Sequence, residues 1–448
     1  MDEVKLPEGW EYSQLLKLGT IVTGKTPSTK DVDNFGGNVP FIKPGDLDKG
    51  GFITKTSDTL TESGLLTVPK LPVNAIVVTC IGNLGKVGIT TKISATNQQI
   101  NSFICNENLN FKFLYYQICT LKPWLENESS ATTIAIVNKG KFSKAPISIP
   151  SLAEQKIIAD KLDTLLAQVD STKARLEHIP QMLKRFRQAV LAAAVSGKLI
   201  STNSEENKLT RLGKIAKDIR YGTSKKCSED KGNVAVLRIP NIGMGYIINH
   251  NLKYADFDSK ELHSLSLEKG DLLLIRSNGS VDLVGKVAVI SENDVKYLFA
   301  GYLIRIRIDQ EKAIPHYISL CLQSPQLRQV IENIARSTSG VNNINSKELA
   351  SLELPLPLLS EQTEIVRRVE QLFAYADGIE KQVHNALERV NNLTQSILAK
   401  AFRGELTAQW RAENPDLISG ENSAQALLAK IQQQRSNTNT IKRSKGDS

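Results

Sequence analysis

The side chains best suited to chemistry in this sequence are amides, hydroxyls and basic groups that gather between turn residues. Asn and Gln can hold adenine by two hydrogen bonds, Arg and Lys can hold guanine, and hydroxyl groups suit phosphate oxygens. Such clusters occur at 96–99, 138–141, 276–279 and 336–343, in both halves of the 448-residue chain. One cluster alone is equally typical of a solvated turn, but their presence in both halves favours contacts with nucleic-acid bases. The candidate DNA-contacting residues are Lys43, Asn97, Gln98, Gln99, Asn138, Lys139, Lys141, Arg238, Arg276, Ser277, Asn278, Arg336, Ser337, Thr338, Asn342 and Asn343.

One segment matches a phosphate-binding loop by its letters. Residues 19–26 satisfy the pattern G-x-x-x-x-G-K-T. The chemistry requires a helix that begins at this lysine, so that the helix N-terminus and the loop amides face the phosphates. Residues 27–37 carry no helical apolar stripe, and no later strand ends in an acidic magnesium ligand. The sequence therefore predicts no ATP site here.

Other catalytic patterns are also incomplete. Residues 38–41 approach the N-P-P-F element with which adenine methyltransferases hold a flipped base, but no glycine-rich cofactor loop follows a strand upstream. A turn that enters a strand is the simpler interpretation. The Pro415-Asp416 pair lacks the acidic-x-Lys partner of a nuclease site, and the five histidines and five cysteines show no spacing typical of catalysis or metal binding. We expect a protein that binds rather than catalyses, with no metal site.

Composition indicates the kind of partner and compartment. The net charge is +9 and the pI is near 9.1, which favours a polyanionic partner. No apolar run reaches the roughly 18 residues needed to span a bilayer. The first five residues do not open a signal peptide. We therefore expect a cytoplasmic protein with no membrane partner.

The elements that must position the polar clusters form an internal repeat. Residues 150–199 recur without a gap at 357–406, so that adding 207 to a position in the first block gives its counterpart in the second. Each block closes a stretch of about 150 residues that differs much more from its partner. The chain is therefore one unit used twice. Identical pairs include Glu154/Glu361, Gln155/Gln362 and Gly197/Gly404.

Both repeated blocks are predicted to be long helices with a narrow apolar stripe. Apolar residues recur in alternating steps of four and three, the heptad pattern of a coiled coil. A helix of about 40 residues is roughly 60 Å long, too long to bury its stripe against one small domain, so its economical partner is the other helix. Because a folded domain separates the two helices, we expect them to pair antiparallel. The residues predicted to pair the helices or dock further subunits are Leu162, Leu165, Val169, Leu183, Phe186, Val190, Val369, Leu372, Val383, Val390, Leu393 and Ile397.

The ends of these helices are marked by proline and glycine. Pro150 and Pro357 stand a few residues before them, and Gly197 and Gly404 are suited to end them. Pro180 lies inside the first heptad pattern, where it removes a backbone donor and clashes with the preceding turn. We therefore expect a kink or a break near Ile179.

The two variable stretches are predicted to be mixed domains of short strands and few helices. Strands are expected at 75–79, 86–89, 271–275 and 286–290, and helices at 111–121 and 316–322. A weaker repeat connects the two domains, which indicates a common scaffold that presents different surfaces. Its matched segments are Leu18-Gly19 with Leu212-Gly213, 40–43 with 235–238, and 85–87 with 285–287.

The predicted fold is α+β, with two similar mixed α/β domains separated by two long repeated helices that pair as an antiparallel coiled coil. About the last 12 residues of the chain are expected to be disordered. The predicted segments are a first variable domain at 1–149, a first helical spacer at 150–199, a linker at 200–208, a second variable domain at 209–356, a second helical spacer at 357–406 and a C-terminal tail at 407–448.

Short motifs beside the helices carry a family resemblance. Residues 149–155 and 356–362 precede the helices, residues 192–199 and 399–407 end them, and Leu-Pro-Glu-Gly-Trp stands at 6–10. With these motifs the chain closely resembles the specificity subunit of type I restriction-modification enzymes, over nearly its whole length. The variable domains differ too much within that family for individual base contacts to be carried over.

The resemblance implies a function without catalysis by this chain. In that family each variable domain is a target-recognition domain that reads one half of a split double-stranded DNA target, and the helices set the gap. Modification subunits, two in number, dock on the helical region and methylate adenine at N6, and restriction subunits add ATP-dependent cleavage. S-adenosylmethionine, ATP and magnesium would thus belong to partner subunits, and this chain would bind no cofactor.

Two other interpretations stay open at the level of sequence. A coiled-coil adaptor whose two domains bind proteins would share the helices and the repeat. An ATP-dependent enzyme would rest on the phosphate-loop match alone. One departure from symmetry is also evident, because residues 200–203 lack the Thr-Ala-Gln-Trp-Arg extension found at 407–411, so the two ends of the helical pair are expected to dock differently.

Overall fold

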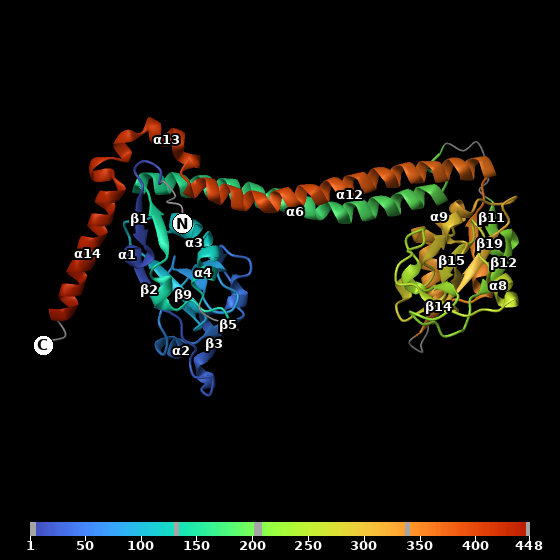
Figure 1. The fold of residues 1–448 in the computed structure, drawn as a ribbon, viewed down its shortest axis with the longest axis horizontal. Coiled ribbons are helices and arrows are strands. Elements are labelled where there is room, and N and C mark those ends of the chain that lie inside the picture. The colour runs from blue at the N-terminus through green and yellow to red at the C-terminus, as the bar shows by residue number, and fades with distance from the viewer. Residues whose placement is uncertain (1–5, 130–133, 201–207, 337–340, 445–448) are drawn as a thin grey trace. The chain divides into compact units, whose positions relative to one another are not determined.

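The computed structural model describes residues 6–129, 134–200, 208–336 and 341–444, with the side chains of 438–444 left out. The chain divides into two compact units. Unit 1 contains residues 1–175 and 387–448, and unit 2 contains residues 176–386. Each unit therefore combines one variable domain with parts of both long helices, as Figure 1 shows by the colours of the ribbon.

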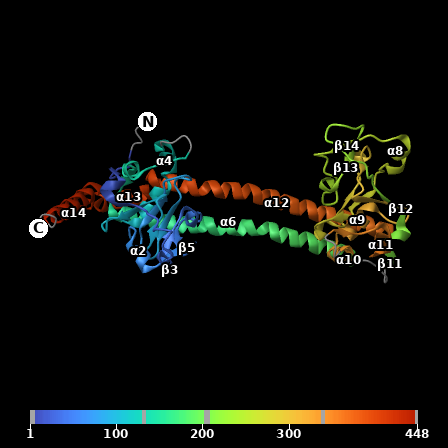
Figure 2. The ribbon, with the colours of Figure 1, turned by 90° about the horizontal axis from the view of Figure 1, so that it is seen from below.

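The variable domain of unit 1 is built on three sheets. The largest has the strand order β2-β9-β6-β7-β4, a smaller one has the order β5-β3-β8, and β1 pairs with β10. Figure 2 shows β3 and β5 close together, in agreement with their antiparallel pairing. The strands are β1 (Glu11–Gln14), β2 (Gly19–Thr23), β3 (Phe35–Ile42), β4 (Phe52–Ile53), β5 (Asp58–Leu60), β6 (Ile76–Thr79), β7 (Val87–Thr90), β8 (Ala95–Thr96), β9 (Ile100–Cys105) and β10 (Pro146–Ile149).

The variable domain of unit 2 has a matching set of sheets. Its strand orders are β12-β19-β15-β17 and β14-β13-β18, and two further pairs are β11-β21 and β16-β20. The strands are β11 (Leu209–Arg211), β12 (Ala216–Tyr221), β13 (Val234–Leu237), β14 (Lys253–Ala255), β15 (Leu272–Ile275), β16 (Ser277–Asn278), β17 (Val287–Val289), β18 (Leu298–Phe299), β19 (Leu303–Ile308), β20 (Asn342–Asn343) and β21 (Glu353–Pro355).

Short helices connect these strands, and two long helices follow the variable domains. The predicted helices at 111–121 and 316–322 and the predicted long helices are confirmed. The α-helices are α1 (Leu15–Leu18), α2 (Glu62–Leu66), α3 (Phe111–Cys119), α4 (Lys122–Glu128), α5 (Lys139–Phe142), α6 (Leu152–Val195), α7 (Leu212–Ile215), α8 (Ser259–Leu265), α9 (Pro315–Gln323), α10 (Pro325–Ala335), α11 (Ser346–Ser351), α12 (Leu359–Phe402), α13 (Ala408–Glu413) and α14 (Ala424–Ser444).

The backbone hydrogen bonds show that the two variable domains share one scaffold. The Asn97 N–H donates to the Ile42 carbonyl, and the Ala300 N–H donates to the Leu237 carbonyl in the same place. The parallel pairs β3-β8 and β13-β18 have the corresponding register. These bonds make Lys43 the counterpart of Arg238, as the weaker repeat predicted for 40–43 and 235–238.

One match of the weaker repeat is wrong. The Leu15 N–H donates to Ala145, and the Leu212 N–H donates to Leu352 at the equivalent position. Leu212 therefore corresponds to Leu15, and not to Leu18. Both segments contain the letters Leu-Gly, which suggested that Leu18 matches Leu212. The hydrogen bonds instead align the start of α1 with the start of α7, a shift of three residues.

A repeated glutamine joins each long helix to its variable domain. Both glutamine side chains are fully buried, and buried amides require partners. The Gln155 amide donates to the Pro150 carbonyl and accepts the N–H of Asn110, which caps α3. Gln362 makes the same two bonds in unit 2, with Pro357 and Ile314. Each glutamine thus fixes the start of α3 or α9 relative to the start of its long helix.

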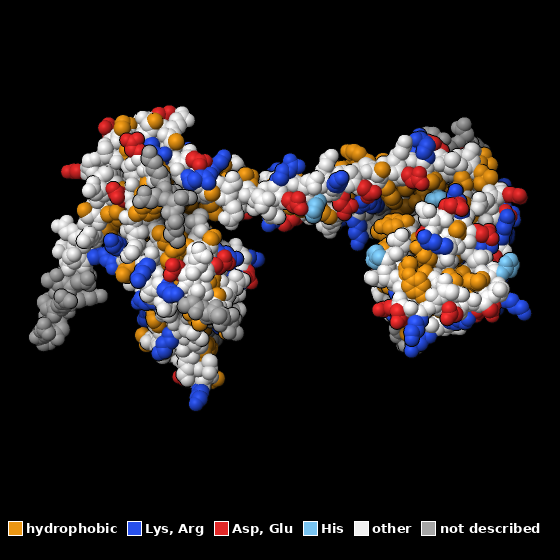
Figure 3. Space-filling view, in the orientation of Figure 1, with side chains coloured by type: hydrophobic (Ala, Val, Ile, Leu, Met, Phe, Trp, Pro, Cys, Tyr) orange, Lys and Arg blue, Asp and Glu red, His pale blue; other side chains and the backbone are white. Residues whose placement is uncertain are grey.

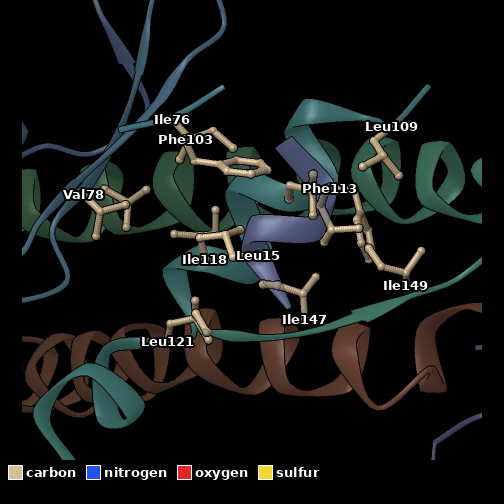
Figure 4. Packing of buried hydrophobic residues seen from close by; sticks show 14 of the residues in the cluster. Leu15, Ile76, Val78, Phe103, Leu109, Phe113, Ile118, Leu121, Ile147 and Ile149 are labelled. Atoms are coloured by element: carbon tan, nitrogen blue, oxygen red, sulfur yellow. The ribbon is translucent and has the colours of Figure 1, made fainter. Parts of the chain in front are cut away.

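The core of unit 1 lies between its largest sheet, α3 and both long helices. Figure 4 shows Phe103 and Ile76 from the sheet packed toward Phe113 and Ile118 of α3. The same cluster contains Ile158 and Leu162 of α6, and Ile397, Leu398 and Ala401 of α12, all at most 9% exposed. Fully burying one of these Ile or Leu side chains contributes about 1.5–3 kcal/mol. The core is therefore complete only when both helices are present.

Unit 2 has the same arrangement with the roles of the helices exchanged. Its main core contains Ile365 and Val369 from the start of α12, and Val190 and Ala194 from the end of α6. In each unit the start of one long helix thus packs with the end of the other, which confirms the predicted antiparallel pairing.

Equivalent hydrogen bonds join the start of each long helix to the residues that follow the end of the other long helix. The Lys161 ammonium donates to the carbonyl of Leu406 in unit 1. Arg368, the repeat counterpart of Lys161, donates to the carbonyl of Leu199 in unit 2. A cation near a helix C-terminus also complements the negative end of the helix dipole. Gly197 and Gly404 end the helices at φ +75° and +73°, as predicted.

Most of the residues predicted to pair the helices are shielded from solvent. Leu162, Val169, Leu183, Val190, Val369, Val383 and Ile397 are at most 9% exposed, and Leu165, Phe186, Leu372 and Val390 are partly buried. Leu393 is 45% exposed and so lies outside the helix seam, while its alternative role in subunit docking stays a prediction. A straight helix has 3.6 residues per turn, so a strict period of 3.5 drifts off the contact line. Leu398 and Ala401, which lie off the strict heptad pattern, are buried beyond this point together with Ile397.

Of the kink or break expected near Ile179, the break does not occur, since α6 is continuous from Leu152 to Val195. Pro180 lies on the exposed side of the helix. There the carbonyl that loses its helical partner can bond water, so the cost of the proline is reduced.

The C-terminal tail is part of unit 1. Ala424 and Ile431 of α14 are 1% exposed and belong to its core. The Arg435 guanidinium donates to the carbonyls of Leu16 and Gly19. Helix α14 extends from Ala424 to Ser444, and the expected disorder of about the last 12 residues stays a prediction. Residues 445–448 lie outside the described part.

A buried carboxylate connects three segments of unit 1. Glu154 is fully buried at the start of α6, and it accepts hydrogen bonds from Trp10, Thr407 and Arg411. The Arg411 guanidinium lies 2.6 Å from the carboxylate oxygen. These donors come from the N-terminal motif and from the Thr-Ala-Gln-Trp-Arg extension, so this extension has a structural role in unit 1.

Among the described helices, none combines the length and the apolar character required to cross a membrane.

The helical seam can be tested with neighbouring substitutions. Leu183 is 7% exposed, whereas Lys184 is exposed beside it. We expect Leu183→Asp to destabilise the protein by several kcal/mol, because it places an unpaired charge in the seam. Lys184→Asp should leave thermal unfolding nearly unchanged. Equal effects of the two substitutions would contradict the assignment of Leu183 to the seam.

The buried carboxylate allows a second test. Glu154→Gln keeps the shape of the side chain but leaves Arg411 without a charged partner, so we expect a loss of roughly 3–5 kcal/mol. The matched control is Glu361→Gln, because Glu361 occupies the same repeat position but is only partly buried. Denaturant unfolding followed by tryptophan fluorescence measures both variants. A loss no greater for Glu154→Gln than for the control would show that the ion pair is dispensable.

Candidate nucleic-acid interface

Polar candidates of unit 1 gather where strands β3 and β8 end. β3 ends before Lys43, β8 ends before Asn97, and the two segments are joined by the bond from the Asn97 N–H to Ile42. The turn 97–99 is held internally, since the Asn97 side chain bonds the side chain and the N–H of Gln99. Gln98 is exposed and accepts a hydrogen bond from the hydroxyl of Thr26.

The segment 138–141 meets this turn through Cys80. The Cys80 N–H donates to the Gln99 carbonyl, and the Cys80 carbonyl accepts from the N–H of Val137. Asn138 then caps α5 by accepting the N–H of Lys141, so its side-chain oxygen has a structural role. Lys139 is exposed, whereas the Lys141 ammonium donates to the carbonyl of Glu128.

The charges around Lys43 are partly compensated. Its ammonium lies 2.5 Å from a carboxylate oxygen of Asp58 and 5.8 Å from the centre of the Phe41 ring. The hydrogen bond from Lys43 holds the pKa of the Asp58 carboxyl below its ordinary value, although burial opposes this shift. Both side chains are about two-fifths exposed, so the pair is open to competition from a phosphate group.

In unit 2 the position equivalent to Cys80 is occupied by Arg276. We call the surroundings of these two residues the corner of each variable domain. The Arg276 N–H donates to Tyr302, and the Arg276 carbonyl accepts from Ile344. These bonds repeat those of Cys80 in unit 1. The side chain of Arg276 lies over the ring of Tyr221 at 4.6 Å from its centre, and its Nε donates to Asn343 at 3.2 Å.

The surroundings of Arg276 are also fixed. The Tyr221 hydroxyl accepts the N–H of Ser346 at the start of α11. Burial raises the pKa of this hydroxyl, but its hydrogen bonds with Ser346 and the nearby Arg276 outweigh this effect and lower the pKa overall. Ser277 and Asn278 form β16, which pairs with Asn342 and Asn343 in β20, so the structure brings these sequence-predicted residues together.

A hollow of about 570 Å³ lies beside this corner. The Arg238 guanidinium on its wall donates to the carbonyl of Asn251, and its buried Nε has no partner. The Lys225 ammonium lies 2.6 Å from a carboxylate oxygen of Glu261, whereas Lys226 is exposed. The residues that line the hollow are Thr223, Ser224, Lys225, Lys226, Cys227, Arg238, Ile239, Pro240, Lys253, Ala300, Gly301 and Tyr302.

The remaining candidates lie at the end of α10. Arg336 is exposed at the C-terminal cap of this helix. Ser337 and Thr338 lie outside the described residues.

Equivalent backbone positions carry different side chains in the two domains. Asn97, Gln98 and Gln99 correspond to Ala300, Gly301 and Tyr302, since the same hydrogen bonds flank both turns. Tyr302 is 63% exposed and was missed, because it belongs to no polar cluster. An alignment of the two turns across the weaker repeat would have found it.

The phosphate-loop match has no phosphate-loop geometry. Residues 19–23 form β2, and Gly24 and Lys25 continue along the sheet, where their N–H groups donate to Ile100 and Thr96. These amides are therefore unable to face a phosphate. Residues 38–41 lie within β3 and not in a turn before it. Among the described residues, no three His, Cys, Asp or Glu side chains are arranged to hold a metal ion.

Basic and acidic side chains are mixed on one face of each unit. Figure 3 shows Lys and Arg side chains interspersed with Asp and Glu on the visible face of both units. Binding of DNA by this face would therefore depend on particular basic side chains and not on a uniform field.

Comparison with known proteins identifies a family. The model of the type I restriction modification DNA specificity domain matches twice, at residues 7–181 and 203–389. The chain is 42% identical over 450 residues to the type I restriction enzyme StySPI specificity subunit of Salmonella potsdam, covering 97% of both chains. It is 41% identical over 465 residues to the EcoKI specificity subunit of Escherichia coli K12, again covering 97% of both.

A solved structure supports the fold. The HsdS subunit from Thermoanaerobacter tengcongensis aligns with a TM-score of 0.60 and 17% sequence identity, over 90% of this chain and 99% of that chain.

Lys43 tests the interface in unit 1. We expect Lys43→Ala to weaken binding of double-stranded DNA to a similar degree for all sequences, and to reduce the slope of log affinity against log salt by about one. The matched control is Lys17→Ala, because Lys17 is exposed on α1, outside the interface. A salt titration of DNA binding by fluorescence anisotropy measures both. An unchanged slope for Lys43→Ala would place the DNA elsewhere.

Proposed function

The chain belongs to the family of type I restriction-modification specificity subunits, and on this premise we propose that it recognises a bipartite double-stranded DNA sequence with one variable domain per half-site. It is a targeting subunit and not the catalytic one. The residues that read DNA are proposed to lie at the strand ends described above, around Lys43 and Gln98 in unit 1 and around Arg238 and Arg276 in unit 2.

The observation that carries this proposal is one scaffold with two different surfaces. The bonds from Cys80 to Gln99 and Val137 recur as bonds from Arg276 to Tyr302 and Ile344. Side chains at these equivalent positions differ in size, charge and hydrogen-bonding groups. Because base edges are distinguished by donors, acceptors and methyl groups, such a pair of surfaces suits two different half-sites on one duplex.

The partners and cofactors follow from the family and are likewise proposed. Modification subunits, two in number, dock on the paired helices α6 and α12 and methylate adenine at N6 with S-adenosylmethionine. Restriction subunits use ATP and magnesium for cleavage. This chain would hold none of these cofactors and would act in the cytoplasm. The exposed Leu393 on α12 is suited to such docking.

A domain exchange tests the proposal. Residues 11–149 are replaced by the equivalent domain of a relative, and methylated adenines are mapped by sequencing DNA from cells that express the chain with its modification subunits. We expect one half of the methylated sequence to change and the other half to stay the same, because each domain has its own strands and helices on a common scaffold.

The reciprocal exchange of residues 209–356 is the matched control and should change the other half. A change of both halves in either chimera would refute independent reading. If the purified complex bound all duplexes equally at every salt concentration, a protein-binding adaptor would be the better description.

A further inference from the structure

The side chain of Arg276 is held in one orientation from two directions. Its guanidinium lies over the Tyr221 ring, and its Nε donates to the Asn343 side chain. Its backbone is fixed on both sides by Tyr302 and Ile344. An arginine restrained in this way loses little conformational entropy when it binds a ligand.

Stacking and the Nε bond leave the two terminal NH₂ groups of the guanidinium for a ligand. Both are donors, and together they match two acceptors in one plane. The O6 and N7 atoms of guanine form such a pair in the major groove of DNA. Adenine offers one acceptor and one donor there, and the edges of thymine and cytosine offer no such pair.

The first variable domain has no such restrained arginine at the equivalent position. Cys80 stands there, is 1% exposed, and burial raises the pKa of its thiol to about 11, so the group is neutral. Thr23 replaces Tyr221, and its hydroxyl donates to Asn101. The corner in unit 1 is therefore closed by a small polar cluster, with no cationic donor pair.

We propose that Arg276 reads a guanine by a bidentate contact, and that this guanine belongs to the half-site recognised by the second variable domain. Tyr221 and Asn343 are positioning residues that hold the guanidinium. This inference rests on the proposed function, and it adds the base that one named side chain recognises. The corresponding corner around Cys80 makes no such contact.

The test uses the assembled complex of this chain with its modification subunits and its methylated target. The second half-site is the half that persists when residues 11–149 are exchanged. Each guanine of that half is replaced in turn by 7-deazaguanine, which lacks N7. We expect one replacement to weaken binding of the wild-type complex roughly fivefold, about half of the discrimination of a bidentate pair.

Arg276→Ala supplies the second arm. Alanine removes both NH₂ donors, whereas a lysine could still hold guanine. We expect this variant to accept other bases at that one position, to become insensitive to 7-deazaguanine there, and to leave the first half-site unchanged. Arg211→Ala is the matched control, because Arg211 is an exposed arginine of β11 in the same unit and is not among the candidate DNA-contacting residues. It should behave as the wild type.

Different outcomes would refute the proposed DNA recognition and the proposed guanine contact of Arg276. A complex that binds without sequence preference would refute the proposed function itself. A complex that discriminates sequences but tolerates 7-deazaguanine at every guanine of the second half-site would overturn the role of Arg276. This wild-type result decides even if Arg276→Ala fails to fold. Unchanged base preference in a folded Arg276→Ala complex would also overturn it.

Discussion

The cores of both units depend on burying the ends of two helices that come from different repeats. In unit 1 the start of α6 supplies Ile158 and Leu162, and the end of α12 supplies Ala401. In unit 2 the start of α12 supplies Val369 and the end of α6 supplies Val190. A variable domain without both helix ends would expose this apolar surface to water. The antiparallel pair is thus part of each core and not an attached spacer.

The fold was largely predictable because its main elements have strong local patterns. The heptad stripe indicated both helices, and the buried apolar runs indicated β6 and β15. The errors arose where the structure depends on exposure to solvent or on contacts between residues far apart in the sequence. Leu393 follows the heptad period but is exposed and so does not pair the helices, and α6 continues without a break through Pro180, which faces water. The docking of the tail depends on few apolar residues, among them Ile431, which form no stripe that a sequence pattern reveals.

The candidate site was predictable only in part. Turn residues indicated loops for the polar clusters, and the structure brings several of them to equivalent positions near strand ends, whereas Arg336 lies at the end of α10. The stacking of Arg276 on Tyr221 joins residues from β12 and the end of β15, and no local pattern indicates such a contact. Some candidates also serve the scaffold, since Asn138 caps a helix and Asn343 holds Arg276. Hydrogen-bond register, and not letter matching, showed which positions of the two domains correspond.

The central claim is that both variable domains read DNA with the same strand ends. The most direct measurement is a cryo-EM structure of the assembled modification complex on its target duplex. The account predicts base edges beside Gln98 and Gln99 in one domain and beside Arg276 and Tyr302 in the other, with phosphates near Lys43 and Arg238. DNA bound against other surfaces, or against non-equivalent surfaces of the two domains, would contradict it.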